Sequence, residues 1–145
     1  MQQESTIDSS VSGTTAVVVY FDFKNYYVGN VGDSRAVLGK TANPGQLKDE
    51  EVKKIKQRGH NLLEGQILTY DHKPSNESEK ERIVAHGGEV MPIKNGRGDF
   101  VGPPRVWKLN CEYPGLAMSR SVGDKVGKEV GVIAEPDVKV FPHDA

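Results

Sequence analysis

The chain has 145 residues, the length of one domain, and a mass of 15.9 kDa. Its formal net charge of −1 gives no long-range attraction to nucleic acid or to anionic lipid, so neither nucleic acid nor a membrane is expected as a partner. The lone cysteine, Cys111, excludes an internal disulfide and a multi-cysteine zinc site; with a polar, acidic stretch at 1–13 that is unlike a secretory signal, it indicates a cytoplasmic or nuclear location.

The first part of the chain predicts β-structure. Residues 1–12 form a polar lead-in, and 14–23 contain a continuous run of β-branched and aromatic residues that is typical of a buried strand. Short turns separate this segment from predicted strands at 26–31 and 35–39. Short turns between strands favour a three-stranded antiparallel meander.

Residues 40–65 are predicted to be a lengthened connection with an exposed helix. Apolar residues recur at loosely helical spacing within the charged stretch 47–58. The basic residues of this stretch allow a contact with phosphate, but the pattern favours a solvated helix face.

The middle of the chain predicts a strand followed by a helix. The apolar segment 66–70 reads as a strand, and Asn76 with Glu79 fits a capping box that opens a helix at 76–86. Gly87 suits the left-handed residue that follows a helix. We expect Ile83 and Val84 to face inward.

Further strands are predicted downstream, separated by glycine-rich and proline-rich connections. Residues 89–93 read as a strand, 94–104 as a mobile loop and 105–109 as a short extended segment. The segment 116–122 predicts a short helix or turn, and 137–141 an edge strand that begins after a proline.

Motifs at five places along the chain point to one family. They are Tyr27–Leu38 (YVGNVGDSRAVL), Asp71–Pro74 (DHKP), Glu81–Ile83 leading to Gly87–Gly88, Gly115–Asp124 (GLAMSRSVGD) and Glu135–Asp137 (EPD). In this order they resemble the central part of the catalytic domain of the metal-dependent serine/threonine protein phosphatases of type 2C, the PPM family. The resemblance assigns 13–145 to a partial phosphatase domain, with an insert at about 40–65 and a flap-like region at about 94–114.

The resemblance implies both a fold and a chemistry. The fold is α+β, a four-layer αββα sandwich of two antiparallel sheets, here incomplete because outer strands and helices are missing at both ends. The chemistry is hydrolysis of phosphoserine and phosphothreonine in proteins by a water molecule that Mg²⁺ or Mn²⁺ activates. Carboxylate oxygens are the ligands that these hard cations prefer.

Carried over residue by residue, the resemblance implies one metal-binding residue. Asp71 matches a position that contributes to a third, weaker metal site. Four further residues are expected to hold the motifs together rather than bind metal or phosphate: Asp33, Arg35, Arg120 and Asp124.

No residue is assigned a catalytic role. Ser119 is not expected to be a nucleophile because the attacking group in this family is water. A proton-donating role for His72 is conceivable, but its Lys-Pro neighbours favour a structural or solvent-facing histidine.

The principal metal ligands of the family lie in an Asp-Gly-His-Gly segment, a later Asp-Gly and a late Asp-Asn. No aspartate of this chain is followed by glycine or asparagine. We therefore expect the isolated chain to be inactive and to bind divalent cations only weakly, through Asp71. The alternatives are a non-catalytic, pseudophosphatase-like binding module and a β-rich domain whose motifs are purely structural. The substrate and the oligomeric state are not predicted.

Overall fold

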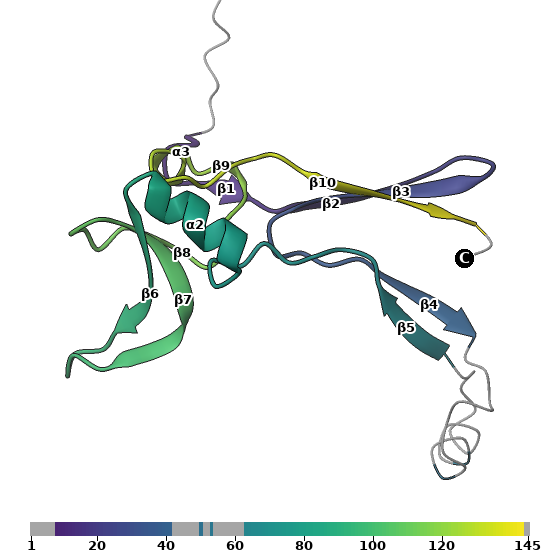
Figure 1. The fold of residues 1–145 in the computed structure, drawn as a ribbon, viewed down its shortest axis with the longest axis horizontal. Helices are drawn as coiled ribbons and strands as arrows, with labels where there is room; N and C mark the ends of the chain where they lie inside the picture. Colours follow the sequence, from purple (N-terminus) through teal and green to yellow (C-terminus); the bar gives the residue numbers. More distant parts are fainter. Residues whose placement is uncertain (1–7, 42–49, 51–52, 54–62, 144–145) are drawn as a thin grey trace, which may run out of the picture.

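The computed structural model describes residues 8–41, 50, 53 and 63–143. These residues form two bodies joined by extended segments (Figure 1). An extended body consists of β2, β3, β10, β4 and β5, and a helical body contains α2, α3, β6, β7 and β8. Within the described ranges, neither helix has the length and apolar character that crossing a membrane requires.

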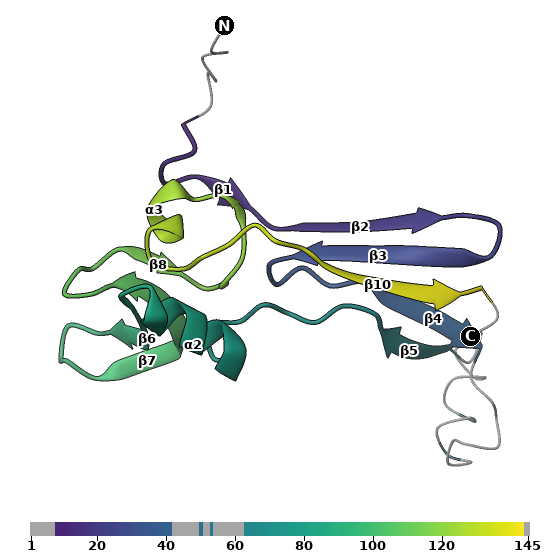
Figure 2. The same cartoon turned by 45° about the horizontal axis from the view of Figure 1, so that its top comes forward.

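The first layer of the extended body is a three-stranded antiparallel sheet in the order β10-β3-β2 (Figure 2). β2 (Ala16–Phe21) and β3 (Asn25–Val31) form a hairpin, and β10 (Asp137–Pro142) pairs with the other side of β3. Strands predicted at 14–23, 26–31 and 137–141 are therefore confirmed. The prediction that the first is buried is wrong, because β2 lies at a sheet edge and four of its six residues are exposed.

The second layer is a pair of strands beneath that sheet (Figure 2). β4 (Val37–Thr41) pairs with β5 (Leu63–Ile67) and not with β3, so the predicted meander is wrong. The chain leaves the first sheet at Gly32, whose φ of +98° favours glycine. A Cβ there would lie 2.3 Å from Thr15 Cγ2, so the crossing also needs a residue without a side chain.

A small apolar cluster lies between the two layers. Tyr26, Val28 and Leu68 form it, and all three are buried. The cluster includes alternate residues of β3, as expected for a strand that has one face toward a second layer. β5 begins before the strand predicted at 66–70 and ends at Ile67.

The helical body is built on α2 (Glu77–Ala85), which packs on the three-stranded sheet β6-β7-β8. These strands are β6 (Gly88–Lys94), β7 (Phe100–Lys108) and β8 (Pro114–Leu116). The predicted helix and the strand predicted at 89–93 are confirmed. The buried core of this body consists of Ile83, Val106, Val130 and Val132.

Two details of α2 differ from expectation. Asn76 makes no side-chain cap bond, so the predicted capping box is wrong; its Nδ2 donates instead to the Asp71 carbonyl at 2.7 Å. Val84 is exposed rather than inward-facing, because Ile83 alone of the pair lies over the sheet. The left-handed residue after the helix is Gly87, as predicted, with φ +76°.

The segment predicted as a mobile loop at 94–104 forms a tight turn and the first half of β7. Asn95 closes this turn, since its Oδ1 accepts hydrogen bonds of 2.9 Å from the amides of Arg97 and Asp99. Gly102, Pro103 and Pro104 therefore lie within a strand, although glycine and proline usually indicate a loop.

No helix forms at 116–122, where strand and bridge residues alternate with bends, so the helical alternative of the prediction is wrong. Arg120 forms a parallel bridge with Ile133, and β9 (Val122–Gly123) pairs with β1 (Gly13–Thr14). A short helix, α3 (Lys125–Lys128), follows instead. Apart from positions 50 and 53, the helix predicted at 47–58 lies outside the described residues.

Candidate functional site

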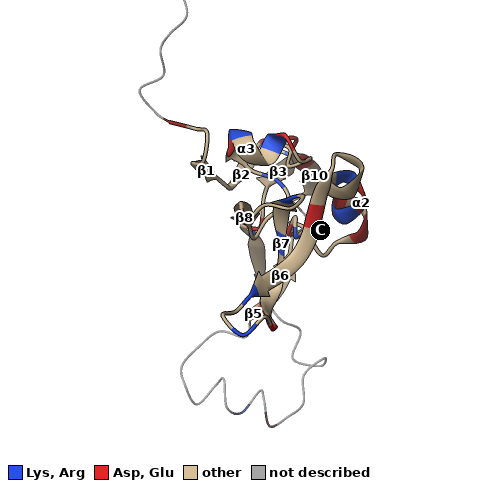
Figure 3. Ribbon diagram, turned by 90° about the vertical axis from the view of Figure 1, so that its left-hand side faces the viewer, with Lys and Arg blue, Asp and Glu red and all other residues tan. Residues whose placement is uncertain are grey.

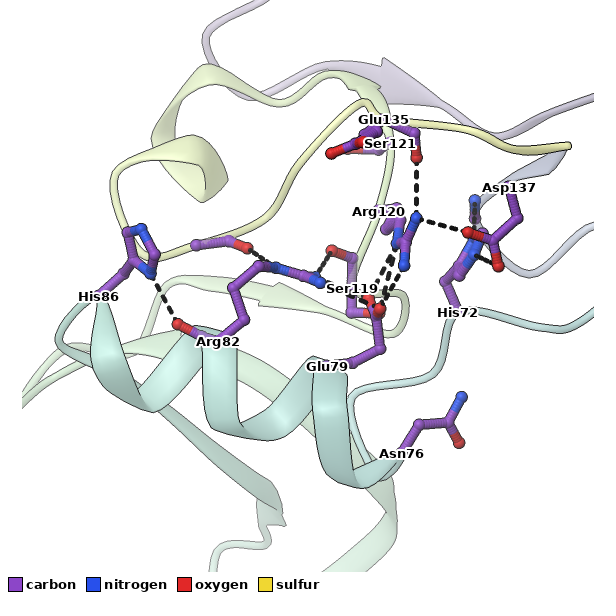
Figure 4. A network of polar contacts seen from close by, with 12 residues as sticks. His72, Asn76, Glu79, Arg82, His86, Ser119, Arg120, Ser121, Glu135 and Asp137 are labelled. Carbon is purple, nitrogen blue, oxygen red and sulfur yellow. Dashed lines mark hydrogen bonds and ion pairs between the residues drawn. The ribbon is translucent and has the colours of Figure 1, made fainter.

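The motifs that lie far apart in the sequence meet where the two bodies join (Figure 4). Gly32 shows how the first two motifs are held together. Its amide donates to His72 Nδ1 at 3.0 Å, and its carbonyl accepts from the His72 amide at 3.0 Å and from Asn30 Nδ2 at 3.1 Å. Both backbone groups of Gly32 are therefore bound in the turn between the layers.

His72 links this turn to β10. Because Nδ1 accepts a hydrogen bond, the hydrogen of the neutral ring is assigned to Nε2, which lies 3.1 Å from Asp137 Oδ2. His72 is fully buried and so does not face solvent. Burial opposes ionisation of Asp137, but its contacts with His72 and Arg120 outweigh that effect and lower the pKa of Asp137 below its ordinary value.

A buried carboxylate, Glu79, lies at the centre of the contacts in Figure 4. Arg82 donates to its two oxygens at 3.0 and 2.6 Å, Arg120 Nη2 donates at 2.7 Å, and Ser119 Oγ donates at 2.6 Å. Burial alone would raise the pKa of Glu79, but these hydrogen bonds outweigh it and lower the pKa to about 2. The carboxylate is therefore charged at any physiological pH.

Arg120 extends this network from α2 to β10. Besides Glu79, it donates to Asp137 Oδ1 at 3.0 Å and to the carbonyl of Glu135 at 3.0 Å. Arg82 similarly reaches the carbonyl of Ser119 at 3.0 Å. Residues 119–121 of the GLAMSRSVGD motif, which we call the SRS segment, and the EPD motif are thereby fixed against α2.

The sequence does not single out Glu79 as a central residue, because there it belongs only to the predicted capping box. The available signal was its i, i+3 spacing from Arg82, which places both side chains on one helix face. Charged residues of both signs lie on α2 (Figure 3). The i, i+3 spacing of Glu79 and Arg82 therefore does not distinguish a buried ion pair from a solvent-exposed one.

Asp71, the predicted metal-binding residue, is paired with Arg35. Arg35 Nε donates to Oδ1 at 3.0 Å and Nη2 donates to Oδ2 at 2.7 Å, a bidentate contact. These hydrogen bonds lower the pKa of Asp71 below its ordinary value. Asp33, in the turn that contains Arg35, forms an ion pair with Lys73.

Asp124, at the end of the GLAMSRSVGD motif, contacts the start of the described chain. It has a left-handed φ of +47°, and its amide donates to the Ser12 carbonyl at 2.9 Å. Its buried side chain lies so close to Gly13 that a Cβ at Gly13 would be 2.1 Å from Oδ2. A glycine at position 13 is therefore needed for this contact.

The comparison with protein families decides the assignment that these contacts suggest. The model of "Protein phosphatase 2C" matches residues 1–145. The chain belongs to the protein phosphatase 2C family.

Curated phosphatase 2C relatives match nearly all of this chain. "Probable protein phosphatase 2C 35" from Arabidopsis thaliana is 38% identical over 151 residues, which cover 94% of this chain and 38% of the relative. "Probable protein phosphatase 2C 12" from Oryza sativa subsp. japonica is 37% identical over 138 residues, which cover 95% of this chain and 30% of the relative. The chain thus spans about a third of the length of these relatives.

Solved structures agree with this assignment. The serine-threonine phosphatase 2C from Toxoplasma gondii superimposes with a TM-score of 0.63 and 27% identity, over 88% of this chain and 36% of that chain. A Caenorhabditis elegans sex determining protein superimposes with a TM-score of 0.58 and 25% identity, over 90% of this chain and 24% of that chain. The α+β sandwich expected from the sequence is therefore confirmed, as an incomplete form of it.

The phosphatase 2C family implies a metal-dependent enzyme, which needs several ligand side chains close together. The described residues contain no group of three or more histidine, cysteine, aspartate or glutamate side chains that could hold a metal ion. Both oxygens of Asp71 contact the Arg35 guanidinium, a cation that would repel a metal ion there. The described residues therefore do not fit a paired-cation centre.

No described serine in this network is arranged as a nucleophile. Ser119 is fully buried, and its hydroxyl donates to Glu79, a carboxylate whose pKa of about 2 makes it a poor base. What the network does is hold the phosphatase 2C motifs in fixed positions relative to one another.

Proposed function

We propose that this chain supplies the central scaffold of a protein serine/threonine phosphatase domain, one that removes phosphate from phosphoserine and phosphothreonine in proteins. The observation that carries this proposal is the convergence of the family motifs on one buried network centred on Glu79 and Arg120. Leaving the buried Glu79 carboxylate without its arginine partners would be costly, so the contacts favour one packing of the motifs.

The scaffold role assigns positions rather than reaction steps to the described residues. Arg120 and Arg82 hold the SRS segment and the EPD motif, and His72 holds the turn at Gly32. Asp71 stays our one proposed metal contact, for Mg²⁺ or Mn²⁺, since a carboxylate oxygen suits these cations. Its pairing with Arg35 supports only weak binding in this chain.

We further propose that the chain alone does not hydrolyse phosphoesters. The absence of an Asp-Gly or Asp-Asn pair from the sequence supports this proposal, because the family uses such segments to hold its metal ions. The lack of a metal-binding cluster among the described residues is consistent with it.

A phosphopeptide hydrolysis assay tests both statements. The chain alone is expected to release no phosphate above background with Mn²⁺ or Mg²⁺. A chimera in which this chain replaces the matching segment of probable protein phosphatase 2C 35 is expected to hydrolyse the same peptide, and EDTA should abolish that activity. A chimera that is folded but inactive would contradict the scaffold proposal. Turnover by the chain alone that EDTA and Asp71→Ala both remove would contradict its predicted inactivity.

The second candidate function is a non-catalytic binding module. The Arg35–Asp71 pair favours it, because a guanidinium already neutralises the carboxylate that would otherwise attract a cation. Fluorescence anisotropy with a labelled phosphopeptide separates the two functions: saturable binding by a chimera that never hydrolyses the peptide supports the binding module.

A further inference from the structure

β2 presents an unprotected strand edge. In the sheet order β10-β3-β2, no described strand pairs with the outer side of β2, so alternate backbone amides and carbonyls of this strand face outward. An unpaired edge of this kind is a template for another strand.

The sequence of β2 lacks the devices that usually prevent edge pairing. Its six residues, AVVVYF, include no charge, no proline and no glycine. The exposed fractions are 62% for Val18, 39% for Val19, 64% for Tyr20 and 62% for Phe21. The opposite edge differs, because β10 carries Asp137, Lys139 and Pro142. Edge pairing should therefore select β2.

We propose that two copies of this chain associate by antiparallel pairing of their β2 strands about a two-fold axis at Val19. A two-fold axis perpendicular to the sheet keeps each side chain on its own face. Residues that lie directly opposite one another in the two strands must therefore both have odd numbers or both have even numbers. With Val19 opposite Val19, Val18 of one copy meets Tyr20 of the other, and Val17 meets Phe21. Both are pairs of a β-branched and an aromatic residue, which stabilise adjacent strands.

Charge does not oppose pairing of this edge with a second copy. The pairing brings no charged side chain of β2 against another, so self-association meets no like-charge repulsion within the strand. From the exposed fractions, the pair of edges presents on the order of 800 Å² of apolar surface, which places the contact among small, weak protein interfaces. We expect a weak dimer with a dissociation constant in the micromolar range.

The dimer closes on itself. Each copy contributes its β2 edge to the two-fold contact, and the charged β10 edges remain outermost, so further strands do not add. Pairing of β2 with the β10 edge of another copy would instead give open-ended growth, which the charges of Asp137 and Lys139 oppose.

Sedimentation velocity of the full 145-residue chain tests the proposal, over concentrations that span the expected dissociation constant. Val18→Lys should raise the dissociation constant at least tenfold. Val138→Lys is the matched control: Val18 and Val138 both lie opposite Gly29 on one sheet face and are both 62% exposed, but Val138 is on β10. It should leave the dissociation constant within about twofold of the original.

Three results would overturn this assignment. The first is a wild-type chain that stays monomeric throughout the concentration range. The second is an equal weakening of the dimer by Val18→Lys and Val138→Lys, which would indicate that sheet faces stack. The third is growth into fibres.

Disulfide trapping keeps the proposal testable should Val18→Lys fail to fold. In a Cys111→Ser background, Val19→Cys should give a covalent dimer under mild oxidation, because the two cysteines lie opposite one another. Val84→Cys, at a valine that is 54% exposed on α2, should stay monomeric in the same background. Equal trapping at both positions would rule out the β2 pairing.

Discussion

At the scale of single residues, Glu79 is the side chain on which most of the site depends. It is 2% exposed and receives hydrogen bonds from Arg82, Arg120 and Ser119. A carboxylate in this position stabilises the fold only while it is charged, because its partners are cations and a hydroxyl donor. Its effect on stability should therefore depend on pH.

The pKa of Glu79 is about 2 in the folded chain and 4.5 ordinarily, a difference equivalent to about 3 kcal/mol. Because the folded pKa is the lower one, this stabilisation is complete above the ordinary pKa and is lost as pH falls toward 2. Glu79→Gln should therefore destabilise the chain by about 3 kcal/mol near neutral pH and by progressively less in acid.

Urea unfolding near neutral pH and near pH 3 measures this dependence. Glu81→Gln, on the exposed side of the same helix, is the control and should change the free energy of unfolding by less than about 0.5 kcal/mol. A loss of stability in Glu79→Gln that is the same at both pH values would show that the charge is not responsible.

At the scale of elements, α2 and β6 are positioned by the tight connection between them. Gly87 takes a left-handed conformation, and Gly88 begins the strand directly beneath the helix. A Cβ at Gly88 would lie 2.7 Å from Ile83 Cγ2 and 3.0 Å from the Val130 carbonyl oxygen. The helix can approach the sheet closely only because position 88 has no side chain.

Gly88→Ala should therefore separate α2 from β6 and destabilise the chain by about 1–3 kcal/mol, as overpacking of a core does. Gly96→Ala is the matched control, because nothing lies within 4 Å of its Cβ position in the β6–β7 turn. Thermal unfolding followed by circular dichroism compares the two. Equal stability of both variants would contradict the close packing at Gly88.

At the scale of the whole molecule, two small apolar clusters are joined by polar contacts. One cluster contains Ile83 and the other Tyr26, and each lies within its own body. Arg120 connects the bodies, because it binds Glu79 on α2 and Asp137 at the start of β10. We infer that this link couples the unfolding of the two bodies.

Arg120→Ala should separate the unfolding of the two bodies. In the original chain, urea unfolding should give one midpoint by Trp107 fluorescence, which reports on the helical body, and by far-UV circular dichroism, which reports on all strands. In the variant the two midpoints should differ by about 1 M urea. Arg97→Ala, at an exposed turn, should leave them coincident; coincident midpoints in Arg120→Ala would disprove the link.

The local elements and the family can be predicted from the amino-acid sequence. The helix that became α2, its left-handed glycine and the strands β3, β6 and β10 follow from residue spacing and turn chemistry, which act over a few residues. The family motifs were likewise visible without a structure, because each occupies a short continuous segment.

Strand pairing and side-chain burial, in contrast, depend on contacts that form in the folded chain. β4 joins β5 instead of β3, β2 is exposed instead of buried, and Glu79 is central although its neighbours Glu77 and Glu81 are solvated. Each of these outcomes depends on partners distant in the chain: Glu79 is buried because Arg120 lies against it. Local spacing carries no information about such long-range contacts, which is why pairing and burial could not be derived from the pattern alone.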